Sequence, residues 1–164
     1  MKLIKISMNE INNPNISLRQ ISSEVNVFDK EFQQFVDDFL SFFIELNKGV
    51  GIAAPQIGKN IRVAIINSKR KDGEEPFVII NPEIIEYSGL DSSYDEGCLS
   101  IPGYKGKVIR KNLLHVRYQD RFANIIENHF EGFEARVFNH EIDHLNGILY
   151  TDRMNSEDRV YTTE

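Results

Sequence analysis

Apolar residues recur with two different periods along this chain, and the two periods predict both helices and strands. Between about Asp29 and Asn47 they return every three or four positions, which predicts an amphipathic helix with a Phe-rich face packed in the core. Asp29 is the expected N-cap, and Gly49 lies just beyond the expected C-terminal end.

The middle of the chain contains short apolar runs that are rich in β-branched residues and predict strands. Residues 61–66 (IRVAII) and 77–80 (FVII) flank a polar segment with Asp72-Gly73, which predicts a hairpin. Asn81-Pro82 is expected to interrupt the second of these strands. Further strands are predicted at 83–87, 107–109, 113–118 and 125–130.

A second helix is predicted from about Gly132 to Asn146, with Gly147 placed for a left-handed C-terminal cap. Its apolar residues cover much of its surface, so it should lie centrally, with the strands around it. The predicted class is therefore α+β: short mixed and antiparallel strands around a central C-terminal helix, plus one N-terminal amphipathic helix. Residues 1–164 form a single domain in this prediction, with a polar tail from about 153 to 164.

The amino-acid composition argues against several classes of function. The 164 residues carry a net charge of -6, which argues against broad nucleic-acid binding because such binding needs a basic surface. No apolar run approaches the roughly 20 residues of a membrane span, and the N-terminus has no signal-peptide pattern. The single cysteine cannot form an internal disulfide, and this is typical of a reducing compartment. We expect a cytoplasmic protein.

The segment with the clearest chemistry is HEIDH, His140 to His144, on the second predicted helix. Residues four apart lie on the same face of a helix, so His140 and His144 can bind one divalent metal ion. Glu141 lies beside them and can accept a proton from water. The pattern predicts a metal-dependent hydrolase.

Two histidines require a third ligand, and the residues alone leave its identity open. Gly147 fits the longer pattern HExxHxxGxxH, but position 150 is a tyrosine. Cys98 offers a thiolate that suits iron or zinc, although most single cysteines are small buried apolar residues. The remaining candidates are Asp152, Glu157, Asp158 and Glu164 downstream, and His115, His129 and carboxylates upstream.

Three fragments, taken together and in order, resemble the signature motifs of the peptide deformylase family. They are GVGIAAPQ (Gly49–Gln56), EGCLS (Glu96–Ser100) and HEIDH (His140–His144). The flanking INPEI (Ile80–Ile84) and Arg110 agree, and the resemblance extends from about Leu18 to Asp152. It implies a hydrolase that removes the formyl group from the N-terminal methionine of nascent polypeptides and releases formate.

The resemblance also implies a role for each matching residue. Metal ligands would be Cys98, His140 and His144, with Fe²⁺ as the physiological ion and Zn²⁺, Ni²⁺ or Co²⁺ as substitutes. The family assigns Glu141 as general base, and assigns the Gln56 amide and the Leu99 N–H to the oxyanion. Glu96 and Arg110 would form a supporting ion pair. The methionine pocket would be bordered by Val50, Gly51, Tyr94, Phe133, Val137 and His140.

The expected partners are formylated nascent peptides and the ribosome, near its exit tunnel. We expect no nucleic-acid specificity, no membrane contact and a monomeric state. Two positions depart from the family pattern. Asn139 stands where glutamine is common, and segment 120–124 lacks the glycine often found in that hairpin.

Two alternatives remain beside the deformylase. One is a peptidase-like hydrolase that uses only HExxH and a downstream ligand. The other is a metal-binding or ribosome-associated module without catalysis, against which Glu141 and Gln56 argue because metal binding requires neither.

Overall fold

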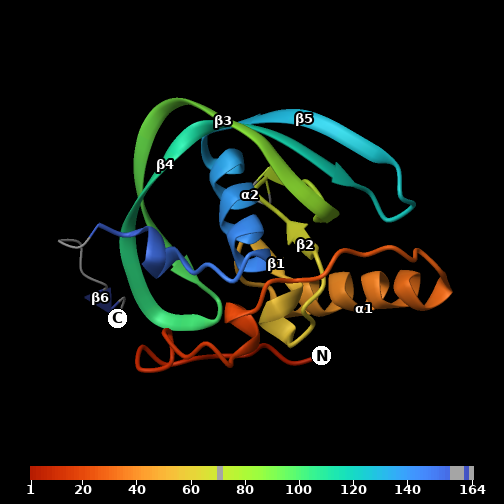
Figure 1. The fold of residues 1–164 in the computed structure, drawn as a ribbon, viewed down its shortest axis with the longest axis horizontal. Coiled ribbons are helices and arrows are strands. Elements are labelled where there is room, and N and C mark those ends of the chain that lie inside the picture. The colour runs from red at the N-terminus through yellow and green to blue at the C-terminus, as the bar shows by residue number, and fades with distance from the viewer. Residues whose placement is uncertain (70–71, 156–160, 163–164) are drawn as a thin grey trace.

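The computed structural model describes residues 1–69, 72–155 and 161–162, and in this part of the chain two α-helices pack against one sheet (Figure 1). The helices are α1 (Lys30–Leu46) and α2 (Gly132–Leu145). The strands are β1 (Gly51–Ala53), β2 (Val63–Ile66), β3 (Phe77–Cys98), β4 (Ile101–Gln119), β5 (Ile125–Glu131) and β6 (Tyr161–Thr162). Short 3₁₀-helices are η1 (Ser17–Arg19), η2 (Ala54–Ile57) and η4 (Tyr150–Arg153).

The sheet has the order β1-β2-β3-β4-β5, with β6 beside β4, and these strands pair antiparallel. An isolated bridge between Ser23 and Ile61 is parallel. The predicted α+β class is confirmed, including the hairpin of β2 and β3.

The sequence of strand β2 is a continuous apolar run because both faces of the strand are covered. All four of its residues are buried, because the two helices lie against its opposite faces. Val63 and Ile65 pack in the cluster that contains the Phe residues of α1. Ala64 and Ile66 pack with Phe138 and the other apolar residues of α2. Helix α2 occupies the centre of the molecule, as predicted (Figure 1).

The strands that follow are much longer than the predicted short pieces. Asn81-Pro82 does not end a strand: it lies inside β3, at a register shift between Ile80 and Glu83. The side chain of Asn81 accepts a hydrogen bond from the N–H of Val25 and donates one to its C=O, which holds the shifted segment against the N-terminal part of the chain. Such shifts let β3 and β4 bend around α2, as Figure 1 shows.

The helix ends follow local chemistry. Asp29 caps α1 as predicted, accepting a bond from the N–H of Phe32 at 2.9 Å. The left-handed residue that ends α1 is Asn47 (φ 48°), two positions before Gly49. Gly147 adopts φ 71° after α2, as predicted, and a Cβ there would lie 2.6 Å from the carbonyl oxygen of Arg19.

The hairpin between β4 and β5 turns without glycine. Ala123 adopts φ 66°, a left-handed conformation that disfavours a side chain. Oδ1 of Asp120 accepts bonds from the N–H groups of Phe122 and Asn124 at 2.8 and 3.0 Å, and these hold the turn.

We predict that Ala123→Gly raises the free energy of unfolding by about 0.5–1 kcal/mol, because glycine adopts this conformation without strain. Urea unfolding with the wild type in parallel measures the change. A lower midpoint for the variant would mean that the loss of unfolded-chain entropy with alanine outweighs the strain of the turn.

The described residues at the start of the tail contact the rest of the domain. Arg153 of η4 donates to Asp143 of α2 at 2.7 Å, and Met154 packs against a buried cluster. Residues 161–162 pair with β4. Residues 156–160 and 163–164, which the predicted polar tail includes, lie outside the described residues.

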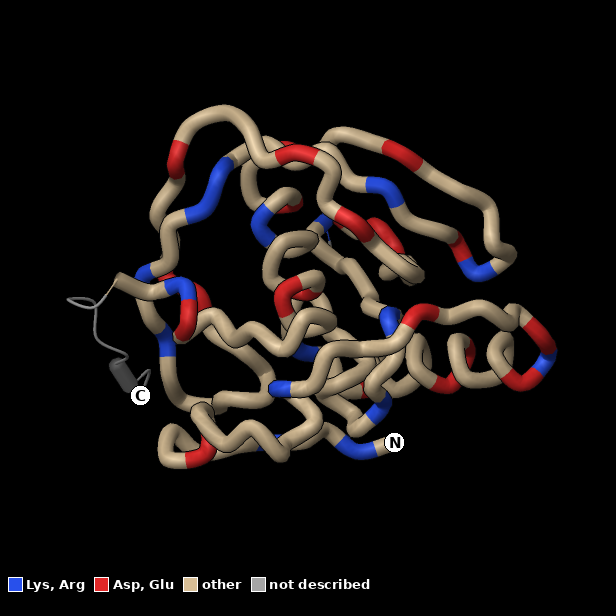
Figure 2. The backbone as a smooth tube through the Cα atoms, in the orientation of Figure 1, with Lys and Arg blue, Asp and Glu red and all other residues tan. Residues whose placement is uncertain are grey.

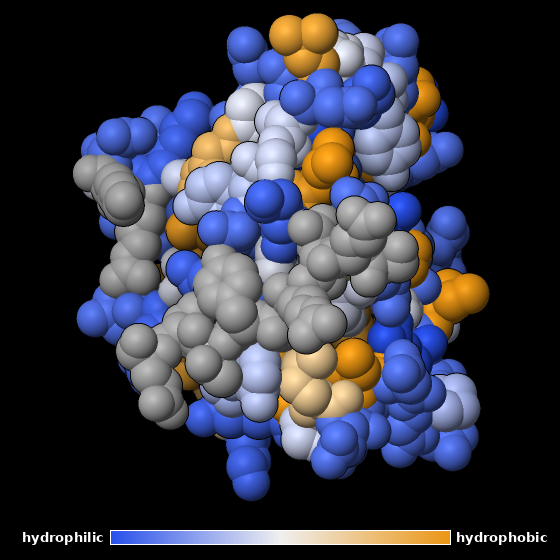
Figure 3. Space-filling model, turned by 90° about the vertical axis from the view of Figure 1, so that its left-hand side faces the viewer, coloured by the Kyte–Doolittle hydropathy of each residue, from blue (hydrophilic) through white to orange (hydrophobic). Residues whose placement is uncertain are grey.

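Charged and apolar residues are mixed in the two views of Figures 2 and 3. Figure 2 shows acidic and basic residues interspersed along the chain. On the face shown in Figure 3, apolar residues form small patches separated by hydrophilic ones. In the described part of the chain, neither helix has the length and apolarity that crossing a membrane requires.

Candidate active site

Helix α2 and the end of β3 bring a cysteine and two histidines together. Cys98 is the last residue of β3, and the ligand atoms of Cys98, His140 and His144 all lie within 4.8 Å of one another. Sγ of Cys98 is 3.3 Å from Nε2 of His144. His144 is buried, while Cys98 and His140 are half-buried. One thiolate and two imidazoles form a donor set that suits a transition-metal ion, so this group could hold one.

Glu96 fixes the orientation of the first histidine. Its Oε2 lies 3.1 Å from Nδ1 of His140, which leaves Nε2 of that ring for a metal. Burial opposes ionisation of Glu96, but hydrogen bonds from His140 and Arg110 outweigh it and hold its pKa far below the usual value. Glu96 therefore stays charged and fixes the orientation of the His140 ring.

Arg110 connects Glu96 to helix α2. Its Nε and Nη2 donate to the two carboxylate oxygens of Glu96 at 2.7 and 2.9 Å, in a bidentate pair. Its Nη1 donates to Asn139 and Asp143, at 2.8 Å each. The ion pair expected between Glu96 and Arg110 is present, and the atypical Asn139 is part of the same network.

Arg136 is a member of this network that the sequence analysis missed. It is 6% exposed, and its Nη1 donates to Oε1 of Glu96 at 2.6 Å. Its Nη2 donates to the carbonyl oxygen of Ser92 at 2.7 Å, and the guanidinium lies over the ring of Tyr94. Arg136 and Asp143 stand four before and three after His140, on its face of the helix. Their helical spacing from His140 was visible in the sequence, but their burial was not.

The pKa values of the two histidines are shifted in opposite directions. Burial lowers the pKa of His140, but hydrogen bonds with Cys98 and Glu96 outweigh it, and the net pKa lies well above the usual value. Burial, with the adjacent charge of His140, moves the pKa of His144 well below it. Because metal ligands must be deprotonated, protons compete with a cation for this site.

Glu141 is buried against the glycine-rich segment. It is 4% exposed, and burial raises its pKa to about 7. Its carboxylate fits only because residue 51 has no side chain: a Cβ on Gly51 would lie 2.5 Å from Oε1 and 2.9 Å from Cδ of Glu141. The second glycine of GVGIAAPQ therefore makes room for the acidic side chain.

We predict that Gly51→Ala lowers kcat/KM for a formylated peptide by about 10²-fold, since a methyl group must displace the Glu141 carboxylate by close to an ångström. Metal content should match the wild type, because Gly51 does not touch the three ligands. Kinetics and metal analysis on the same preparation test this. Wild-type kinetics in the variant would show that Glu141 has room to move without consequence.

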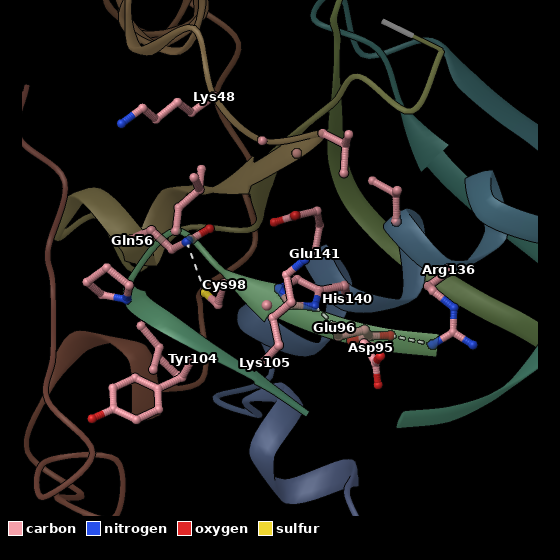
Figure 4. A pocket seen from close by; sticks show the side chains of 18 of the residues that line it. Lys48, Gln56, Asp95, Glu96, Cys98, Tyr104, Lys105, Arg136, His140 and Glu141 are labelled. Carbon is pink, nitrogen blue, oxygen red and sulfur yellow. Dashed lines mark hydrogen bonds and ion pairs between the residues drawn. The ribbon is translucent and has the colours of Figure 1, made fainter. Parts of the chain in front are cut away.

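Gln56 is fixed with its amide nitrogen toward the cysteine. Its Oε1 accepts a bond from the N–H of Ala53 at 2.9 Å, so its Nε2 points to the other side. Nε2 lies 3.5 Å from Sγ of Cys98 and 3.1 Å from Oγ of Ser100. Figure 4 shows Gln56, Cys98, His140 and Glu141 around the same space.

A cavity of about 620 Å³ opens beside these groups. Gln56, Cys98, Leu99 and Glu141 line it. So do all the residues predicted for the methionine pocket, which are Val50, Gly51, Tyr94, Phe133, Val137 and His140. The rings of Tyr94 and Phe133 lie 5.9 Å apart and form an aromatic wall.

The other candidate ligands lie elsewhere. His115 and His129 stack on each other across β4 and β5, with ring centroids 4.2 Å apart. Asp152 forms an ion pair with Arg19. Glu157, Asp158 and Glu164 lie outside the described residues. Among described residues, the metal-ligand group is that of Cys98, His140 and His144.

The amino-acid sequence is similar to those of known peptide deformylases. The sequence model of the family described as polypeptide deformylase matches residues 7–160. Peptide deformylase 2 of Nostoc sp. is 38% identical over 162 residues, covering 94% of this chain and 89% of the relative. Peptide deformylase of Mesorhizobium japonicum is 41% identical over 142 residues, covering 86% and 80%.

Solved structures agree with the sequences. The crystal structure of peptide deformylase from Thermotoga maritima has a TM-score of 0.82 and 32% identity, with 94% of this chain and 97% of that chain covered. The enzyme from Legionella pneumophila has a TM-score of 0.81 and 36% identity, with 94% and 86% covered. The chain described here belongs to the peptide deformylase family.

Proposed function

We propose that this chain removes the formyl group from N-terminal formylmethionine by hydrolysis in the cavity beside Cys98, His140 and His144. Peptide deformylase activity is that of the family. The observation that carries the proposal is a cluster of three metal-ligand atoms, two of whose residues, Cys98 and His140, line the same cavity as the buried carboxylate of Glu141. Formate and a free N-terminal methionine are the products.

Cys98, His140 and His144 would hold the metal ion, for which we propose Fe²⁺, with Zn²⁺, Ni²⁺ or Co²⁺ as substitutes. A divalent ion in such a site lowers the pKa of a coordinated water and polarises a carbonyl oxygen. The set fits the softer transition metals because a thiolate is among the donors. Metal analysis of protein purified without oxygen identifies the ion.

Glu141 is the general base and then the general acid in this proposal. Its pKa of about 7 lets it exchange a proton near neutral pH in either direction. It accepts a proton from the attacking water, whose oxygen bonds to the formyl carbon. It then delivers that proton to the amine nitrogen as the C–N bond breaks.

Gln56 and Leu99 stabilise the charge that develops on the formyl oxygen. The bond from Ala53 orients the Gln56 amide before substrate arrives, so little reorganisation is needed. The N–H of Leu99 is the second donor that we propose. Donors of this kind each contribute about 3–4 kcal/mol to transition-state stabilisation.

The methionine side chain would lie against Val50, Val137 and the aromatic wall of Tyr94 and Phe133. These residues are largely apolar, which suits an unbranched thioether. Strand β1 is at the edge of the sheet, and its open side offers backbone groups that can pair with the substrate as an added strand.

Formylated nascent peptides are the proposed substrates, so the protein would act in the cytoplasm beside the ribosome exit tunnel. We propose that it acts as a monomer. The visible part of the face in Figure 3 has only small separated apolar patches, and this supports the proposal for that face, because stable dimers usually bury larger patches. Sedimentation at micromolar concentration measures the state, and a dimer would contradict this part.

Formate release from formyl-Met-Ala-Ser tests the proposed function directly. We expect turnover by the metal-loaded protein. For acetyl-Met-Ala-Ser, whose hydrolysis would release acetate, we expect a kcat/KM about 10²-fold lower, because its extra methyl group must fit beside the ligands. Protein that contains its metal ion but releases no formate would contradict the proposal.

A further inference from the structure

Three lysines surround the opening of the active-site cavity. Lys5 comes from the N-terminal segment, Lys48 from the connection between α1 and β1, and Lys105 from β4. All three are exposed and line the same cavity. In Figure 4, Lys48 and Lys105 lie on opposite sides of Gln56 and Cys98. Within the described residues, none of the three forms an ion pair.

The acidic residues of the cavity do not neutralise these lysines. Glu96 is bound by two guanidinium groups and His140, and Glu141 is buried in the interior. Asp95 is the one exposed carboxylate among the lining residues. Three lysines therefore face one aspartate at the opening, although the whole chain has a net charge of -6. The positive charge is local to the place where a peptide must leave the cavity.

We propose that Lys5, Lys48 and Lys105 bind acidic side chains in the residues that follow formylmethionine, and so favour nascent chains with acidic N-terminal segments. This inference rests on the proposed function. If methionine lies in the apolar part of the cavity, the chain behind it passes the opening, advancing about 3.3 Å per extended residue. Residues two to four positions after methionine then meet the lysines.

Such a preference should be moderate and sensitive to salt. Exposed ion pairs are individually weak, and each is screened as the Debye length falls from about 10 Å at 0.1 M salt to about 3 Å at 1 M. Since three cations act on the same short segment, we expect a five- to tenfold effect on kcat/KM at low ionic strength, and almost none at high ionic strength. Long-range attraction acts mainly on encounter, so kcat should change least.

The test compares formyl-Met-Ala-Glu-Glu, formyl-Met-Ala-Gln-Gln and formyl-Met-Ala-Lys-Lys, all with amidated C-termini so that no terminal carboxylate contributes. We expect kcat/KM to fall in that order at low salt and the differences to disappear at high salt. Equal values for the three peptides at low salt would overturn the inference. Absence of turnover for all three would instead contradict the proposed function.

Variants assign the preference to these lysines. The triple variant Lys5→Gln, Lys48→Gln and Lys105→Gln should bring the ratio between the Glu-Glu and Gln-Gln peptides close to one. A matched control with Lys2→Gln, Lys30→Gln and Lys107→Gln has the same change of net charge outside the cavity, and should keep the ratio. A preference that survives in the first variant, or that is lost equally in both, would overturn the inference. Because a ratio is measured, a general loss of active protein does not affect the outcome.

Discussion

Replacing Glu141 with glutamine is expected to lower kcat for formate release by about 10³-fold without loss of metal. Glutamine has nearly the same shape but cannot accept and return the proton, and positioned acid–base groups contribute about 10²–10⁴-fold. Metal retention follows because Cys98, His140 and His144 are untouched. The free energy of unfolding should not fall, since the substitution removes a buried carboxylate whose Oε2 has no hydrogen-bond partner among the described residues.

Glu134→Gln is the matched control for this variant. Glu134 also lies on α2, but it pairs with Lys69 outside the cavity, so its substitution should leave formate release within about twofold of the wild type. Single-turnover kinetics separate the chemical step from product release. Full turnover by a metal-loaded Glu141→Gln protein would contradict the proposed role of Glu141 as general base and acid, whereas a metal-loaded wild type that releases no formate would favour the non-catalytic module.

The helices and the class of the fold could be predicted because their patterns are local. Each of these patterns depends on neighbours within a few positions: the Asp29 cap, the Phe-rich face of α1 and the cap at Gly147. The strands were predicted too short because their continuity depends on distant partners. The residues near Asn81 in the sequence do not indicate that Val25 forms hydrogen bonds with the Asn81 side chain, or that β3 continues past Pro82.

The candidate site was predicted in part by resemblance and in part by spacing. The helical spacing of His140 and His144 is local, and residue chemistry made Cys98 one of several candidates for the third ligand. Its selection needed either the family motifs or the structure, because 42 positions separate Cys98 from His140. The roles of Gln56, Leu99 and the pocket residues stay predictions, although they line one cavity.

Arg136 and Asp143 were missed because their function depends on burial. On a helix alone, both would be assigned to solvent. In the structure, Arg136 donates hydrogen bonds to Glu96 and Ser92 and lies over the ring of Tyr94. Asp143 accepts hydrogen bonds from Arg110 and Arg153. Each buried charge has partners, as desolvation requires. The network connects His140, through Glu96, to Tyr94 of the pocket wall, which should keep both rigid.

Cys98→Ala is expected to abolish both metal retention and formate release. The thiolate is one of three protein ligands, and two histidines alone leave a site with much weaker affinity. Alanine fits the half-buried position, so the fold should persist. Metal content after gel filtration and formate release from formyl-Met-Ala-Ser measure the two losses.

Thermal unfolding with and without a chelator separates loss of metal from loss of fold. A metal at 1,000 times its dissociation constant stabilises a protein by about 4 kcal/mol, so a chelator should lower the wild-type midpoint and leave that of Cys98→Ala unchanged. Ser100→Ala is the loop control: it removes a partner of Gln56 but no ligand, and should keep its metal. If Cys98→Ala instead retained one metal per chain and normal turnover, the two histidines would be sufficient, as in a hydrolase that uses only HExxH and a downstream ligand.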